Sequence, residues 1–110
     1  MIIEIRKELK TGVVELAILA LLIDKEMYGY ELAQDLNDRS DGKIKVKEGT
    51  LYPILYRLEE KKVIKSYWQA PKGRGKPRKY YQVTPNGEEY YHLYKKEWLI
   101  ISNFLNQLIK

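Results

Sequence analysis

The sequence of 110 residues contains no cysteine and only one histidine. Without cysteine it can form neither disulfides nor zinc–thiolate sites, so the fold has to rest on side-chain packing. Long apolar runs are also missing, because Glu15 interrupts the longest one, at residues 13–23, and we expect no membrane span. No export signal stands at the start of the sequence, so we expect a cytoplasmic protein.

Residues suited to catalysis are scarce. The one histidine, His92, falls among tyrosines in a predicted helix, where an ordinary surface or interface role fits it. The acidic pairs Glu59 with Glu60 and Glu88 with Glu89 are adjacent in sequence, so each pair diverges by about 100° around its helix and makes no acid/base couple. We therefore expect no enzyme, no metal site and no cofactor.

Positive charge is concentrated in one third of the chain, although the net charge is only +5. Residues 43–79 contain twelve basic and three acidic side chains. Residues 1–42 contain five basic and nine acidic side chains, and residues 80–110 contain three of each. This concentration is typical of a surface that meets a polyanion. A solvated lysine-rich face is the alternative.

The length and composition predict one globular domain that begins with helices. Apolar residues at 11–23 predict a buried helix, with Thr11 as its N-cap. A polar turn is expected at 24–27, followed by a second helix at 28–37. Small polar residues then mark a loop at 38–45.

A third helix is expected at residues 48–62. Leu51, Leu55 and Leu58 recur at spacings of four and three, which predicts a core stripe. Pro53 lies past the first turn, where it removes a backbone donor and should bend the helix. The opposite face then carries Gly49, Tyr52, Pro53, Tyr56, Arg57 and Glu60.

A hairpin and a long helix complete the pattern. Residues 63–70 and 78–84 are rich in aromatic and β-branched residues, which predicts two strands joined by a tight turn of glycines and prolines. Thr84 is expected to cap a helix that begins at Pro85. The order predicts a mainly α (α+β) fold, a winged helix-turn-helix with a two-stranded β-wing and a long C-terminal dimerisation helix. We expect these as one compact unit divided into residues 1–84 and 85–110.

The third helix of a helix-turn-helix unit enters the major groove of DNA. Tyr52 and Tyr56 suit that role, because they offer hydroxyls and flat rings one turn apart; core packing is the alternative for Tyr52. Lys47 falls at the N-cap position but cannot accept a backbone hydrogen bond, so a phosphate contact or simple solvation explains it better. The DNA-binding residues expected around this helix are Lys45, Lys47, Thr50, Tyr52, Tyr56 and Arg57.

The tip of the hairpin is the second expected DNA contact. Its glycines let the backbone approach phosphates, and its cations displace condensed counterions. Arg74 at the tip suits a narrow minor groove. A nucleotide-binding loop fits poorly, because these glycines join strand to strand rather than strand to helix. The residues expected to contact DNA here are Lys72, Gly73, Arg74, Lys76 and Arg78.

The last predicted helix carries an apolar seam with the spacings 3, 4, 3, 4 and 3, a heptad pattern. A parallel stripe widens the apolar surface beyond what one small domain can cover, so we expect a homodimer. A helix folded back on its own core is the alternative. The interface residues expected are Ile5, Leu9, Tyr91, Tyr94, Trp98, Ile101, Leu105 and Leu108.

Five stretches in the same order resemble the PadR family of bacterial transcriptional regulators: MYGYEL at 27–32, EGTLYPIL at 48–55, RLE at 57–59, RKYY at 78–81 and TPNG at 84–87. The resemblance covers nearly the whole chain and implies a repressor that binds near-palindromic double-stranded operators as a homodimer. The single C-terminal helix is similar to that of the smaller subfamily. The resemblance also implies an aromatic or multidrug-like effector at the dimer interface, with Trp98 lining its cavity; packing in the seam is the alternative for Trp98.

Two other interpretations of the basic surface stay open. A protein-interaction module would use it to bind acidic partners. An architectural winged helix would bind RNA or DNA without sequence preference. The ratio of specific to non-specific affinity for DNA separates both alternatives from a transcriptional regulator. We expect such a regulator to be associated with the nucleoid.

Overall fold

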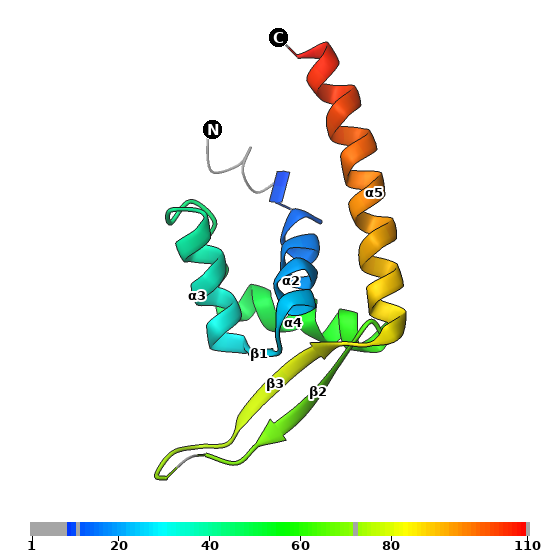
Figure 1. Ribbon diagram of the computed structural model, residues 1–110. Coiled ribbons are helices and arrows are strands. Elements are labelled where there is room, and N and C mark those ends of the chain that lie inside the picture. The colour runs from blue at the N-terminus through cyan, green and yellow to red at the C-terminus, as the bar shows by residue number, and fades with distance from the viewer. Residues whose placement is uncertain (1–8, 11, 72, 110) are drawn as a thin grey trace.

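The computed structural model describes residues 9, 10, 12–71 and 73–109, in which helices surround the base of a projecting hairpin (Figure 1). The elements follow the predicted order, so the winged helix-turn-helix with its long last helix is confirmed. They are α2 (Val13–Asp24), β1 (Met27–Tyr28), α3 (Gly29–Arg39), α4 (Glu48–Glu60), β2 (Ile64–Gln69), β3 (Arg78–Val83) and α5 (Pro85–Leu108).

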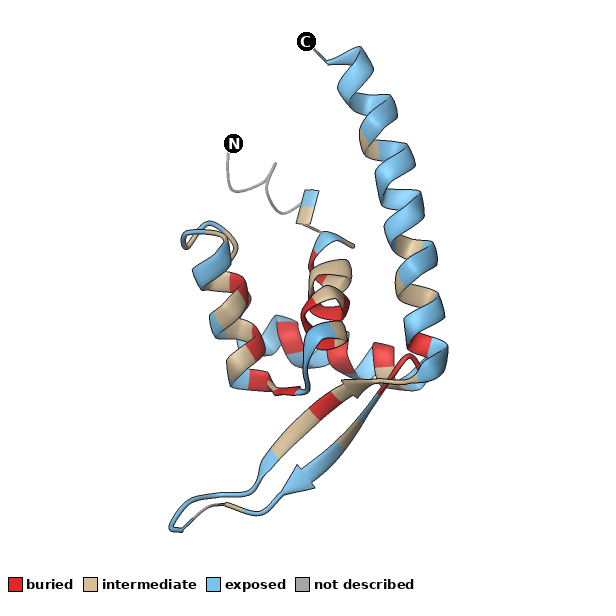
Figure 2. Ribbon diagram, in the orientation of Figure 1, coloured by how far each residue is buried: buried red, intermediate tan, exposed pale blue. Residues whose placement is uncertain are grey.

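The core lies between α2, α3, α4 and the base of the sheet (Figure 2). Leu51, Leu55 and Leu58 are fully buried, which confirms the predicted stripe of α4. The helix runs unbroken through Pro53. Other elements contribute side chains that are almost completely enclosed: Ile18 and Leu19 from α2, Leu32 from α3, and Met27, Ile64 and Tyr81 from the sheet.

The segment before α3 is not the polar turn that the sequence predicts. Met27 and Tyr28 form β1, which pairs antiparallel with Tyr81 and Tyr80 of β3, so the sheet has three strands in the order β1–β3–β2. Met27 is only 1% exposed. A strand of two residues has no alternating pattern of its own, and its partner is far away in sequence, so local patterns could not reveal it.

Two helix boundaries also differ from the prediction. α2 begins at Val13 with Gly12 at the N-cap position and no side-chain cap; the predicted cap Thr11 lies outside the described residues. α4 ends at Glu60 because Lys62 takes a left-handed backbone conformation, with a φ of 62°. The N–H of Val63 then donates to the carbonyl of Leu58 at 3.1 Å, which closes the helix end.

The first turn of α5 is fixed onto the segment that follows α4. The Thr84 hydroxyl accepts the N–H of Gly87 at 2.9 Å, as predicted for a cap, and donates to the Lys62 carbonyl at 2.7 Å. The Thr84 N–H donates to the Val63 carbonyl at 3.1 Å. Gly87 lies directly on that carbonyl, because a Cβ built at Gly87 would be 1.8 Å from its oxygen. Only glycine fits this junction.

Beyond its first turn α5 rests on α2. The Tyr90 hydroxyl donates to the Glu15 carboxylate at 3.0 Å, and the Tyr94 hydroxyl donates to the Gly12 carbonyl at 2.8 Å. The rest of α5 extends past the helical body and is almost entirely exposed (Figure 2). Within the described ranges, no helix is both long enough and apolar enough to span a bilayer.

The close contact at Gly87 predicts that adding one methyl group there will strongly lower the stability of the fold. Gly87→Ala should lower the free energy of unfolding by about 2 kcal/mol or more, because the methyl overlaps a backbone carbonyl rather than a flexible side chain. Urea unfolding followed by circular dichroism, at equal protein concentrations, measures the change.

Gly49→Ala is the matched control for this experiment. A Cβ at Gly49 meets no heavy atom within 4 Å, so Gly49→Ala should be at least as stable as the unmodified chain. Unfolding midpoints that agree for Gly87→Ala and the unmodified chain would contradict the packing of α5 described above.

Candidate nucleic-acid interface

The face of α4 opposite its leucine stripe is open to solvent. Tyr56 is 64% exposed and Tyr52 is 43% exposed, and Gly49, Pro53 and Glu60 are also exposed. These five residues are called the free face of α4 below. The exposed Arg57, predicted for the same side of the helix, lies at the edge of this free face. The free face can therefore offer aromatic edges, hydroxyls and backbone groups to a ligand, with a cation beside them.

Tyr52 is positioned by contact with α3. A Cβ added to Gly29, the first residue of α3, would lie 2.5 Å from the Tyr52 hydroxyl oxygen and 2.9 Å from its ring. The tyrosine ring therefore lies against the bare backbone of Gly29. Tyr52 is thus partly packed on α3 and partly exposed, and the DNA contact expected for it stays a prediction.

Two tyrosines, Tyr56 on α4 and Tyr81 behind it, have a raised pKa. A hydrogen bond to the Glu60 carboxylate raises the pKa of Tyr56. Burial, with the negative charge of Glu59 as a smaller cause, raises the pKa of Tyr81 to about 12. Neither phenol carries a negative charge at neutral pH, so neither would repel a polyanion.

Glu59 connects the last turn of α4 to the wing. One carboxylate oxygen accepts a hydrogen bond from the Ser66 hydroxyl at 3.0 Å, and the other lies 3.9 Å from the Lys79 ammonium group. The ammonium group also lies 5.9 Å from the ring centre of the exposed Trp68. Sequence reasoning missed these residues as a group, because only the pairing of Trp68 with Lys79 across the hairpin brings them together.

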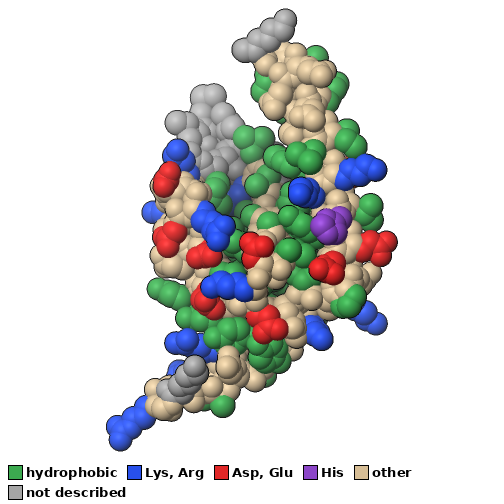
Figure 3. All heavy atoms as spheres, viewed as in Figure 1, with side chains coloured by type: hydrophobic (Ala, Val, Ile, Leu, Met, Phe, Trp, Pro, Cys, Tyr) green, Lys and Arg blue, Asp and Glu red, His purple; other side chains and the backbone are tan. Residues whose placement is uncertain are grey.

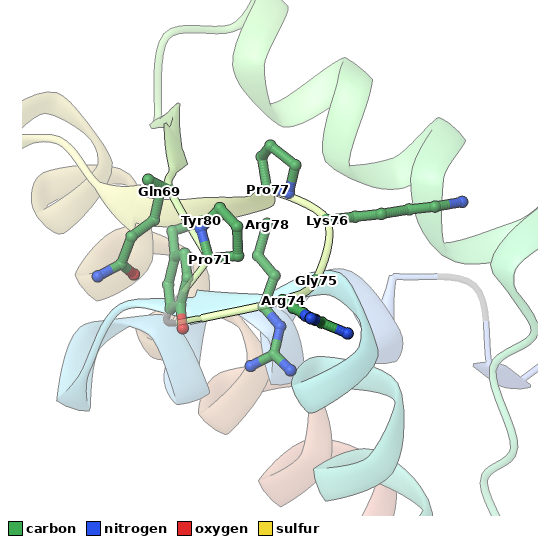
Figure 4. Close-up of a pocket in the computed structure, with 9 residues that line it drawn as sticks. Gln69, Pro71, Arg74, Gly75, Lys76, Pro77, Arg78 and Tyr80 are labelled. Atoms are coloured by element: carbon green, nitrogen blue, oxygen red, sulfur yellow. The ribbon is translucent and has the colours of Figure 1, made fainter.

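The hairpin of β2 and β3 projects from the helical body, and basic side chains gather at its tip (Figures 1 and 3). Gly73, Arg74 and Lys76 are exposed there, while Lys72 lies outside the described residues. A hollow of about 440 Å³ lies beside the tip, and Figure 4 shows Lys76 extending away from Tyr80 at its edge.

Arg78 differs from the cations at the tip. Its guanidinium lies 4.6 Å from the ring centre of Tyr28, on the outer face of the sheet. Tyr28 and Tyr67 flank Tyr80 across the three strands, with ring centres 5.4 and 5.8 Å from that of Tyr80. The structure thus places Arg78 on an aromatic surface, which limits how far it can reach.

Two exposed cations, Lys45 and Lys47, lie at the start of α4, and Thr50 in its first turn is exposed as well. Lys47 occupies the N-cap position without a side-chain cap bond, as expected. The positive end of the helix dipole is therefore open to an anion. Arg57 is exposed as well and borders a groove of about 610 Å³ between α4 and the start of α2, with Lys10 opposite.

The expected interface residues of α5 fall into two groups. Tyr91 and Tyr94 are half-buried against their own chain. The others on the helix are open to solvent, with exposed fractions of 43% for Trp98, 57% for Ile101, 45% for Leu105 and 62% for Leu108. In the N-terminal arm, Leu9 is exposed and Ile5 lies outside the described residues.

Known proteins share both the sequence and this geometry. The model of the transcriptional regulator PadR-like family matches residues 18–93. The transcriptional regulator Rv3488 of Mycobacterium tuberculosis is 36% identical over 81 residues, which cover 74% of this chain and 71% of that protein. A transcriptional regulator from Clostridium thermocellum superposes with a TM-score of 0.86 at 36% identity, over 94% of this chain and 99% of that one.

A PadR-like transcriptional regulator from Bacillus cereus is also similar, with a TM-score of 0.79 and 36% identity, over 92% of this chain and 95% of its own. Such proteins are regulators of transcription rather than enzymes, and DNA binding is implied for them. The family match spans most of the chain, and the free face of α4 and the basic wing agree with it. This chain belongs to the PadR-like family of transcriptional regulators, as the five sequence stretches predicted.

Proposed function

We propose that this chain represses transcription as a homodimer bound to a near-palindromic double-stranded operator. The observation that carries the proposal is the exposed free face of α4 beside a wing with a cationic tip, with Glu59 in the last turn of α4 holding the two strands of the wing through Ser66 and Lys79. Two α4 helices would enter successive major grooves about one helical turn apart, with the wings outside them. Because its target is DNA, we place the protein on the nucleoid.

The proposed contacts divide between phosphates and bases. The exposed cations Lys45, Lys47, Arg57, Arg74 and Lys76 surround the free face and would neutralise backbone phosphates. Tyr52, Tyr56 and Thr50 would reach base edges from α4. Arg78, which lies on Tyr28, would act nearer the base of the wing.

Dimerisation would use the part of α5 that its own chain leaves uncovered. Trp98, Ile101, Leu105 and Leu108 are exposed large apolar side chains on one seam of that helix. A second copy can cover them with the same seam, because a two-fold interface is self-complementary. The half-buried Tyr91 and Tyr94 would border this interface.

We further propose that an aromatic ligand relieves repression by inserting between the two α5 helices at Trp98. The Gly87 junction fixes each α5 to the α4 of the same chain. A change in the angle between the two α5 helices would therefore change the distance between the two α4 helices. The ligand must bind the two arrangements with different affinities for this to work.

Removal of the wing cations tests the DNA contact. Arg74→Ala and Lys76→Ala should each weaken binding several-fold and lower the salt slope by about 1, on preferred and scrambled duplexes alike. Fluorescence anisotropy across a salt series, on a duplex that the protein enriches from a random pool, measures this.

Lys95→Ala and Lys96→Ala are the matched controls, since both side chains are exposed on α5 and carry the same charge. An equal loss in the wing and control variants would refute a specific wing contact. If the random pool yields no preferred sequence, the operator proposal fails and binding without sequence preference is favoured.

A charge in the α5 seam tests the dimer. Leu105→Glu should produce monomers in sedimentation equilibrium while helix content stays unchanged, because the Leu105 side chain is 45% exposed within a single chain. Asn103→Glu, exposed beside His92 and Lys96, is the control and should stay dimeric. A dimeric Leu105→Glu variant would exclude this part of α5 from the interface.

The two tryptophans allow a test of the ligand proposal. Anilinonaphthalene sulfonate, an aromatic probe, should bind the unmodified protein and lower its affinity for the enriched duplex. Trp98→Ala should abolish probe fluorescence, whereas Trp68→Phe, a change in the wing, should retain it. Retention of probe binding by Trp98→Ala would place the aromatic site elsewhere.

A further inference from the structure

Gly49 is a helical glycine with no internal reason to lack a side chain. It lies in the first turn of α4, and an added Cβ would meet no heavy atom within 4 Å. It is absent from the glycines with positive φ. Gly29 and Gly87 differ, because Tyr52 and the Val63 carbonyl respectively lie on them. Nothing inside the chain therefore requires a glycine at this position, and the missing side chain leaves room for a close approach from outside.

Pro53 leaves the backbone at Gly49 with an open acceptor. In an α-helix the carbonyl of Gly49 would accept the N–H of the residue four positions later, which is Pro53. Proline has no N–H, so this carbonyl lacks its usual helical donor. Gly49 and Pro53 lie on the same exposed face. The Gly49 carbonyl therefore has no N–H at its usual donor position, and no side chain of its own residue covers the helix there.

The surroundings of Gly49 favour an anionic partner. Gly49 and Pro53 line the groove between α4 and the start of α2, where Lys10 and Arg57 are the cations. The carboxylate of Glu15 also lines this groove, but it lies 3.7 Å from the Lys61 ammonium group and accepts the Tyr90 hydroxyl. Its charge is thus largely balanced within the protein, and the groove keeps the positive charge of Lys10 and Arg57.

We propose that Gly49 is a specificity-determining residue whose backbone lies against base edges in the major groove. Its carbonyl accepts a hydrogen bond from an exocyclic amino group, either N6 of adenine or N4 of cytosine. These two bases are the ones that present an amino donor in the major groove. The inference rests on the proposed function, since it requires α4 to read DNA.

The experiment combines a protein variant with modified bases. In the duplex that the full chain enriches from a random pool, each adenine is replaced in turn by purine and each cytosine by 2-pyrimidinone, which lack only the amino group. One replacement should weaken binding of the unmodified protein at least fivefold. Whether that position is an adenine or a cytosine identifies the donor.

Gly49→Ala should fold at least as stably as the unmodified chain and bind scrambled duplex equally well. It should lose at least tenfold in affinity for the enriched duplex, because the methyl group holds the backbone away from the bases. The base replacement that matters for the unmodified protein should then have no further effect.

Gly75→Ala in the wing is the matched control. The added methyl makes only an ordinary contact there, 3.6 Å from Pro71, and the replacement that depends on Gly49 should still weaken binding by this variant. A Gly49→Ala variant that keeps the full preference for the enriched duplex would overturn the inference and leave the proposed function intact. If the unmodified protein prefers no sequence, both this inference and the proposed function fail.

Discussion

The junction between the end of α4 and the start of α5 is the contact on which the arrangement of this protein depends. The left-handed Lys62 turns the chain into β2, and its carbonyl accepts the Thr84 hydroxyl at 2.7 Å. Gly87 then rests on the Val63 carbonyl with no room for a side chain. Because backbone meets backbone here, the angle between α4 and α5 is set by rigid atoms rather than by adjustable side chains.

The wing is tied to the same region by side chains. Glu59, one turn before the junction, contacts both strands of the hairpin through Ser66 and Lys79. Helix α4, the wing and α5 therefore meet within a few residues of one another. The proposed relief of repression requires such a connection, because a change between two α5 helices can alter DNA binding only if α4 and α5 move together.

Local patterns in the sequence predicted much of the fold and part of the candidate site. The leucine stripe of α4, the Thr84 cap and the hairpin with its basic tip depend on residues close together in the chain, and each appears in the structure. The short strand β1 was missed, since its pairing partner lies in β3. Arg78 begins the predicted strand, but its packing on the distant Tyr28 could not be read from the local sequence.

The sequence by itself determined the order of the main helices and of the hairpin, where positive charge gathers and that the last helix carries a wide apolar surface. These properties follow from periodicity and composition, which are local. Only the tertiary structure separated three glycines that look alike in sequence: Gly29 lies under Tyr52, Gly87 lies on a carbonyl, and Gly49 faces open space. The physical reason is that a glycine's role depends on the atoms its missing side chain would meet, and folding brings those atoms from elsewhere in the chain.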